Sequence, residues 1–131
     1  MDANEYPQVL SRRVLVVDDN LDAAESLALL LRATKHDVRT TTEGPAALEV
    51  ARTFRPEIVL LDLGMPVMDG REVARRLRQE PTAVHALIVA VTGYEEEDLT
   101  KSGAQDFDAW LTKPVDLEAL QNLLARGPIR A

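Results

Sequence analysis

Short apolar runs that lack regular polar alternation constrain the fold of this chain more than any other feature. Most of their members are branched aliphatic residues, which suits β-strands that are covered on both faces, as in a parallel sheet. One further stretch is β-branched but more polar, as expected of an edge strand. The predicted strands are residues 13–17, 37–42 (the polar one), 58–61, 87–91 and 107–112.

Segments with helical spacing of apolar residues separate these strands, and each has a start or stop signal. Asp, Asn or an early Pro favours a helix start, and Gly or a following Pro ends a helix. The predicted helices run from a cap at Asp19 or Asn20 to about Lys35, from Gly44-Pro45 to Pro56, from Asp69-Gly70 to about Gln79, from Glu95 to Gly103, and from a cap at Asp116 to Gly127.

Five strands alternating with five helices predict an α/β fold, a flavodoxin-like (βα)5 doubly wound parallel sheet with right-handed crossovers. Two strand orders are common for such sheets, and we expect 2-1-3-4-5, which places the first and third strands side by side. We interpret residues 1–12 as a flexible leader, 13–126 as one domain and 127–131 as a C-terminal tail.

Composition and charge exclude several classes of function. The chain has 131 residues and no cysteine, so disulfides, thiolate catalysis and cysteine-based metal sites are excluded. Its two histidines, His36 and His85, lack a zinc-like spacing, and we expect both on the surface. A formal charge of -7 argues against binding a nucleic-acid backbone. No run approaches the ~20 apolar residues of a membrane span, and no secretory signal is present, so we expect a cytoplasmic domain without membrane contact.

Reactive side chains follow the predicted strands. Asp18 and Asp19 follow the first, Asp62 the third, Thr92 the fourth and Lys113 the fifth. Because the carboxyl ends of parallel strands share one edge, we expect these groups to converge. Three carboxylates repel one another, and oxygen-only ligands open to water favour Mg²⁺. A cation and an ammonium beside a carboxylate also suit phosphoryl transfer, so we interpret Asp62 as a nucleophile.

These motifs together resemble a response-regulator receiver domain of two-component signalling. The resemblance covers about 13–125, and its motifs are Asp18-Asp19, Leu61 to Gly70, Thr92-Gly93 and Thr112-Lys113-Pro114. It implies that Asp62 is the phosphoacceptor. It also implies that Asp19 and Asp62 bind Mg²⁺, for which Mn²⁺ can substitute, together with the backbone carbonyl of Gly64 and, mainly through water, Asp18.

The resemblance also implies how the domain signals. Thr92 and Lys113 would contact the phosphoryl oxygens, and Trp110 would be the aromatic switch residue. A histidine kinase or histidine phosphotransfer protein would be the donor. A protein target or a dimer partner would read the face formed by the fourth helix, fifth strand and fifth helix. The domain would catalyse only its own phosphorylation and dephosphorylation. Thr-Gly-Tyr at 92–94 and the Lys-Pro-Val-Asp-Leu ending resemble receivers of hybrid histidine kinases.

Two positions depart from the commonest pattern of that family. Gly64 brings no side chain over the site, and Tyr94 is aromatic, so both should tune the lifetime of the phosphoryl group. A degenerate receiver that binds partners without phosphorylation remains the alternative. A flavodoxin would need a polar phosphate loop after the first strand, and a haloacid-dehalogenase-type phosphatase would need an aspartate at position 64. A P-loop enzyme would need a glycine-rich loop before Lys-Ser/Thr.

Overall fold

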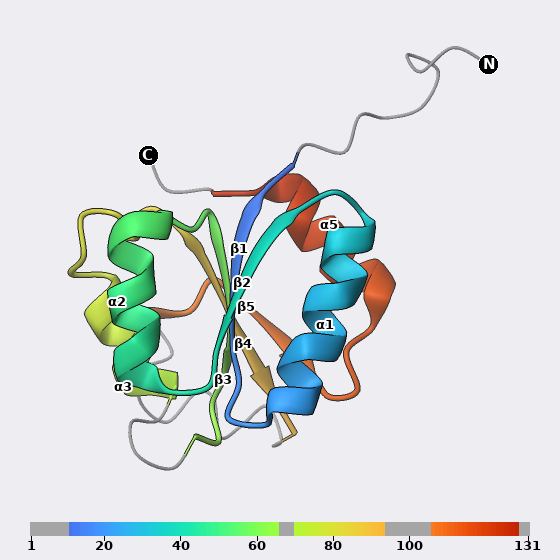
Figure 1. The fold of residues 1–131 in the computed structure, drawn as a ribbon, viewed down its shortest axis with the longest axis horizontal. Helices are drawn as coiled ribbons and strands as arrows, with labels where there is room; N and C mark the ends of the chain where they lie inside the picture. Colours follow the sequence, from blue (N-terminus) through green and yellow to red (C-terminus); the bar gives the residue numbers. More distant parts are fainter. Residues whose placement is uncertain (1–10, 66–69, 94–105, 129–131) are drawn as a thin grey trace.

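The computed structural model describes residues 11–65, 70–93 and 106–128. It confirms a parallel five-stranded sheet in the order β2-β1-β3-β4-β5 (Figure 1). The elements are β1 (Arg13–Val17), α1 (Leu21–Ala33), β2 (Asp37–Thr41), α2 (Gly44–Phe54), β3 (Ile58–Asp62), α3 (Gly70–Leu77), β4 (Leu87–Thr92), β5 (Ala109–Thr112) and α5 (Leu117–Arg126). No helix among the described residues has the length and apolar character to cross a membrane.

Helices cover both faces of the sheet, with α2 and α3 on one side and α1 and α5 on the other (Figure 1). Alternate residues of β1 serve the two cores: Leu15 and Val17 join the cluster under α2 and α3, whereas Val14 and Val16 join the cluster under α1 and α5. Every residue of β3 and of β4 is buried, which explains the unbroken apolar runs that precede Asp62 and Thr92.

The predicted helix signals have clear structural counterparts. Asn20, rather than Asp19, caps α1, and its side chain accepts a hydrogen bond from the Ala23 N–H. Asp116 caps α5 by accepting from the Glu118 N–H, and Gly127 ends that helix with a positive φ of 64°. The predicted fourth helix and the site residue Tyr94 lie outside the described residues.

Two element boundaries differ from the prediction around Arg78. The helix α3 ends at Leu77, and β5 begins at Ala109 rather than Phe107. The Asp108 carboxylate accepts a hydrogen bond from the Ile88 N–H and is ion-paired with the buried Arg78 guanidinium. At the start of β5, the Asp108 side chain therefore accepts the Ile88 N–H in place of a backbone carbonyl of the neighbouring strand.

Arg12 joins the beginning and the end of the domain at the amino-terminal edge of the sheet. Its guanidinium donates from Nε to the Leu124 carbonyl at 3.0 Å and from Nη2 to the Ala125 carbonyl at 3.2 Å, both at the end of α5. Its Nη1 also lies 3.4 Å from a Glu57 carboxylate oxygen. A Cβ on Gly127 would lie 2.5 Å from the guanidinium, so a larger residue would displace Arg12, and the positive φ of 64° at this position also favours glycine.

The expectation that His36 lies on the surface is wrong, since its side chain is buried, with 5% exposed. Its Nδ1 accepts a hydrogen bond from the Arg12 N–H at 3.0 Å, and its Nε2 is buried without a partner among the described residues. Burial, and then the Arg12 guanidinium, lower the pKa of His36 below 6.5, whereas the Glu57 carboxylate opposes this effect. The neutral imidazole is therefore the form that fits the folded protein.

We expect the folded protein to lose stability as the pH falls through 6.5, because His36 is protonated more easily after unfolding. His36→Asn should flatten this dependence, whatever its effect on stability at neutral pH. The measurement is the free energy of unfolding by urea at several values between about pH 7.5 and 5.5. The matched control is His85→Asn, at an exposed histidine, which should keep the wild-type slope. An unchanged slope in His36→Asn would contradict the assignment.

Candidate phosphoacceptor site

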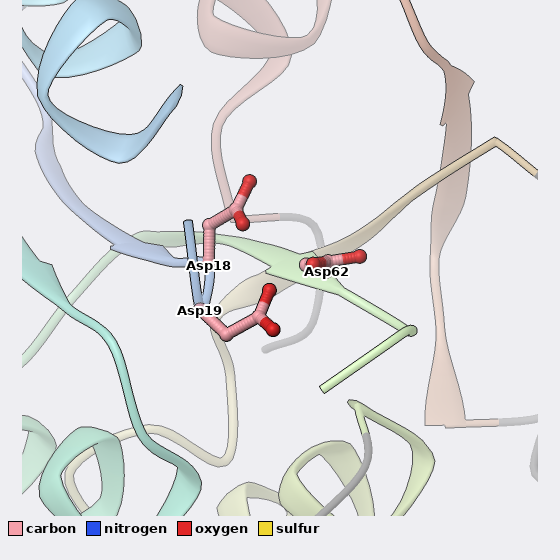
Figure 2. Close-up of side chains that lie close together, drawn as sticks. All are labelled: Asp18, Asp19 and Asp62. Carbon is pink, nitrogen blue, oxygen red and sulfur yellow. The ribbon is translucent and has the colours of Figure 1, made fainter. Parts of the chain in front are cut away.

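The strand order brings three aspartates to one edge of the sheet. In the β1–β3 pair, Val17 lies opposite Leu61, so Asp18 and Asp62 follow side by side. Asp19 comes next in the chain, and ligand oxygens of all three side chains lie within 4.8 Å of one another. Figure 2 shows the three carboxylates gathered at this edge. The predicted convergence of Asp18, Asp19 and Asp62 is therefore found in the structure.

Backbone N–H groups hold two of these carboxylates in place. The Asn20 N–H donates to Asp18 Oδ1 at 2.9 Å, and the Gly64 N–H donates to Asp62 Oδ1 at 3.0 Å. Asp18 and Asp62 are buried, whereas Asp19 is exposed. The site therefore combines two fixed carboxylates with a third that faces solvent, an arrangement that leaves one side open to a ligand.

Lys113 supplies the only described ammonium group that is ion-paired in this cluster. Its Nζ lies 3.5 Å from Asp18 Oδ2 and 3.7 Å from Asp62 Oδ1. Its backbone N–H donates to the Thr92 carbonyl at 2.9 Å, which fixes the lysine where β5 ends beside β4. Lys113 thus lies where the sequence places it, in direct contact with the predicted nucleophile.

The charges of this cluster do not balance. Burial raises the pKa of the Asp62 carboxyl above its ordinary value; the Gly64 N–H lowers it, the Asp18 carboxylate raises it, and the Lys113 ammonium lowers it. Three carboxylates face one ammonium, which leaves excess negative charge in a partly buried space. Oxygen ligands with solvent access and uncompensated negative charge fit a hard divalent cation such as Mg²⁺.

The remaining predicted residues take different positions. Thr92 ends β4 with 2% of its surface exposed, and its neighbour Val91 lies opposite Asp62 in the strand register. Gly64 is exposed beside Asp62 and uses its N–H to hold it. Trp110 lies on β5 with 39% exposed, so it is a surface residue in this conformation. Thr92 and Gly64 therefore lie at the same edge of the sheet as Asp62, whereas Trp110 lies on β5, the outer strand.

Gly70 is a residue whose closeness to the site the sequence did not reveal. A Cβ at this position would lie 2.6 Å from the Asp62 carbonyl oxygen and 2.9 Å from Leu63 Cα. The start of α3 therefore packs directly on the backbone that carries Asp62. In the sequence, the Asp69-Gly70 motif indicates only the shape of a loop and the start of a helix, because a close approach between distant backbone segments leaves no periodic signal.

We expect Gly70→Ala to lower the free energy of unfolding by about 1–3 kcal/mol, because the backbone of Asp62 and Leu63 must shift to admit a methyl group. Alanine is otherwise the better helix former, so propensity alone predicts the opposite sign. Urea unfolding measures the change. The control is Gly93→Ala, where an added Cβ meets nothing within 4 Å. Equal effects of the two substitutions would show that the close contact does not matter.

Comparisons with known proteins agree with this geometry. The family of response regulator receiver domains matches residues 14–125. Response regulator PleD of Caulobacter vibrioides is 40% identical over 111 residues, which cover 82% of this chain and 24% of PleD. The chain therefore spans about a quarter of the length of this curated relative.

Two solved structures share the fold. The receiver domain of the sensor histidine kinase PA1611 from Pseudomonas aeruginosa, which has a magnesium ion coordinated in its active site cleft, superposes with a TM-score of 0.80 at 25% identity, covering 89% of this chain and 97% of that one. A response regulator from Burkholderia pseudomallei with a phosphorylated aspartic acid, a calcium ion and citrate gives 0.78 at 27% identity, covering 87% and 66%.

The strand order, the aspartate cluster and the family match lead to one class of protein. The chain belongs to the response regulator receiver domain family, whose members take part in two-component signalling.

Proposed function

We propose that this domain accepts a phosphoryl group on Asp62 from a phosphohistidine of a histidine kinase or a histidine phosphotransfer protein. The single observation that carries the proposal is the cluster itself, in which the oxygens of three aspartates lie within 4.8 Å and Lys113 Nζ lies 3.7 Å from Asp62. In the step, an Asp62 oxygen bonds to phosphorus while the phosphorus–nitrogen bond of the donor breaks. The product is an acyl phosphate on Asp62.

The residues at this edge fit a Mg²⁺ ion. We assign Asp19 and Asp62 as its side-chain ligands, the Gly64 carbonyl as a backbone ligand, and Asp18 as a contact made mainly through water. When bound, the ion supplies positive charge that offsets the carboxylates and the phosphoryl oxygens. The exposed position of Asp19 and the solvent access of the site favour a cation that keeps several waters.

Lys113 and Thr92 have separate tasks in this proposal. Phosphoryl transfer depends mainly on positioning and on neutralising charge on the three equatorial oxygens. The Lys113 ammonium, already beside Asp62, would exchange its carboxylate partners for a phosphoryl oxygen. The Thr92 hydroxyl would donate to a second oxygen. Gly64 and Tyr94 would set how readily water reaches the acyl phosphate, and therefore how long it persists.

We further propose that partners read the state of Asp62 at the β5 edge of the sheet, next to α5. Trp110 on β5 and Leu117 on α5 are exposed apolar residues, with 39% and 47% exposed. Inward movement of Trp110 on phosphorylation would alter this surface. The domain acts in the cytoplasm in this proposal, and it turns over no substrate other than its own phosphoryl group.

Intact-mass spectrometry after incubation with acetyl phosphate and Mg²⁺ tests the proposal. We expect a gain of one phosphoryl group that disappears when the metal is chelated. A folded protein that binds Mg²⁺ but gains neither phosphate nor a beryllofluoride adduct would be a degenerate receiver, and the proposal would be wrong. A beryllofluoride complex without measurable phosphate would instead indicate rapid hydrolysis of the acyl phosphate.

A further inference from the structure

A pocket of about 220 Å³ lies at the edge of the sheet opposite the phosphoacceptor site. Arg13 at the start of β1, Glu57 just before β3 and Ala86 just before β4 all line it, whereas Asp18 and Asp62 follow the carboxyl ends of their strands. No part of the proposed phosphoryl chemistry uses this pocket. Its other lining residues are Arg55, Pro56, Pro81, Thr82, His85 and Pro128.

Two basic side chains of this pocket, Arg55 and His85, have no polar partner among the described residues. Within the described parts of the chain, neither the Arg55 guanidinium nor the His85 imidazole makes a hydrogen bond or an ion pair. Unpaired basic groups beside a concave surface favour an anionic ligand.

The one carboxylate of the pocket is already neutralised. Glu57 lies 3.4 Å from the Arg12 guanidinium and 3.5 Å from that of Arg13, and it also accepts the Arg13 N–H at 3.0 Å. Arg13 in turn donates from Nε to the Arg55 carbonyl at 2.8 Å. Glu57 and Arg13 thus hold one another, and Arg55 and His85 remain to bind an anion.

The hydroxyl group of Thr82 adds a second indication. Its Oγ1 is hidden from solvent and has no hydrogen-bond partner among the described residues. A buried unsatisfied hydroxyl is costly and calls for an explanation. A ligand oxygen in the pocket, reached by rotation of this side chain, would satisfy it.

Part of the pocket wall is held in place by the protein itself. Three prolines, Pro56, Pro81 and Pro128, contribute rigid apolar surface. The loop between α3 and β4 is held by Arg78, which donates from Nη1 to the carbonyls of Val84 and Ala86 at 3.3 and 2.7 Å. A preformed site avoids the ordering cost that weakens binding to a loose surface.

We propose that this pocket binds a small organic anion, with its charged group at Arg55 and His85 and a compact apolar body against the prolines. The volume is below the roughly 300–1,000 Å³ of sites for drug-sized ligands, so the body is no larger than one aromatic ring. A carboxylate and a phosphate share the required chemistry. Benzoate and phenyl phosphate are therefore the two probes, and benzyl alcohol is the neutral analogue.

The experiment is a titration followed by amide chemical shifts of the full 131-residue chain carrying Asp62→Asn, in buffer without Mg²⁺, so that phosphorylation cannot contribute. We expect saturable shifts at Glu57, Thr82, His85 and Ala86 with the anions and not with the alcohol. The tighter of the two anions identifies the preferred charged group. Arg55→Gln, which keeps the Cβ and the backbone carbonyl, should weaken binding at least about tenfold.

The matched control is Arg126→Gln, which removes one exposed arginine that does not line the pocket and should leave the affinity unchanged. Thermal unfolding checks that both variants fold. Any one of three results would overturn the proposal: equal shifts with benzyl alcohol, shifts confined to the opposite edge of the sheet around Asp18 and Asp19, or an affinity that Arg55→Gln leaves within about twofold. Absence of saturable shifts at millimolar anion would also overturn it.

Discussion

Asp62→Asn should abolish phosphoryl uptake completely, the largest functional effect we expect from a single substitution. The carboxylamide is not a nucleophile, and the neighbouring Asp18 is held by the Asn20 N–H and does not replace it. The measurement is the intact mass after incubation with acetyl phosphate and Mg²⁺, beside wild type. Asp37→Asn, at an exposed aspartate on the opposite edge of the sheet, is the matched control and should gain phosphate normally.

The same substitution should raise the thermal midpoint in metal-free buffer. It removes one of three clustered carboxylates, and burial already disfavours the charged form of Asp62. The amide oxygen can still accept the Gly64 N–H, so the loop is expected to keep its conformation. If the Asp62→Asn protein still gained a phosphoryl group, the phosphoacceptor would be another residue. If its thermal midpoint were much lower than that of wild type, repulsion among the three carboxylates would not destabilise the folded protein.

Arg78→Met should lower the free energy of unfolding by about 3–5 kcal/mol, a large share of the stability of a domain of this size. The Arg78 side chain is 10% exposed and pairs with Asp108, whose side chain is 5% exposed. Its guanidinium also donates to the carbonyls of Val84, Ala86 and Asp106. Methionine keeps most of the volume but removes the guanidinium from a buried carboxylate and from three carbonyls.

Urea unfolding measures this change, with Arg75→Met as the matched control. Arg75 lies on α3, three residues before Arg78, is about half exposed and pairs with the partly exposed Glu72, so its loss should change stability little. A double variant that also carries Asp108→Leu should lose less than the sum of the two single changes, because the carboxylate that lost its guanidinium is then also removed. Equal effects of Arg78→Met and Arg75→Met would contradict a structural role for the buried pair.

The sequence predicted the fold and the centre of the site because both depend on patterns along the chain. Buried parallel strands have unbroken apolar runs, and the topology of such sheets brings their carboxyl ends together. That rule, together with the expected strand order 2-1-3-4-5, places Asp18, Asp19 and Asp62 at one edge with Lys113 nearby, and the structure shows this arrangement. The chemical roles of these residues stay predictions until phosphorylation is measured.

Features that depend on a single distant contact could not be predicted. The buried ring of His36 accepts the Arg12 N–H, a pairing between distant residues that no local pattern indicates. Arg78 follows the apolar face of α3 and has the sequence context of a surface arginine, yet its partners lie up to 30 residues away. Whether Asp19 or Asn20 caps α1 depends on the exact residue at which the helix begins, and a sequence pattern defines helix ends only to within one or two residues.

The contact of Arg12 with the last carbonyls of α5 has a topological consequence. It brings chain positions 12 and 125 together at one pole of the domain, while Asp62 lies at the other. The first and last positions of the domain are therefore close enough in space to be joined by a short linker. A short peptide joining these positions, with a new opening cut in a loop away from Asp62, should give a circular permutant that folds and keeps its aspartate cluster.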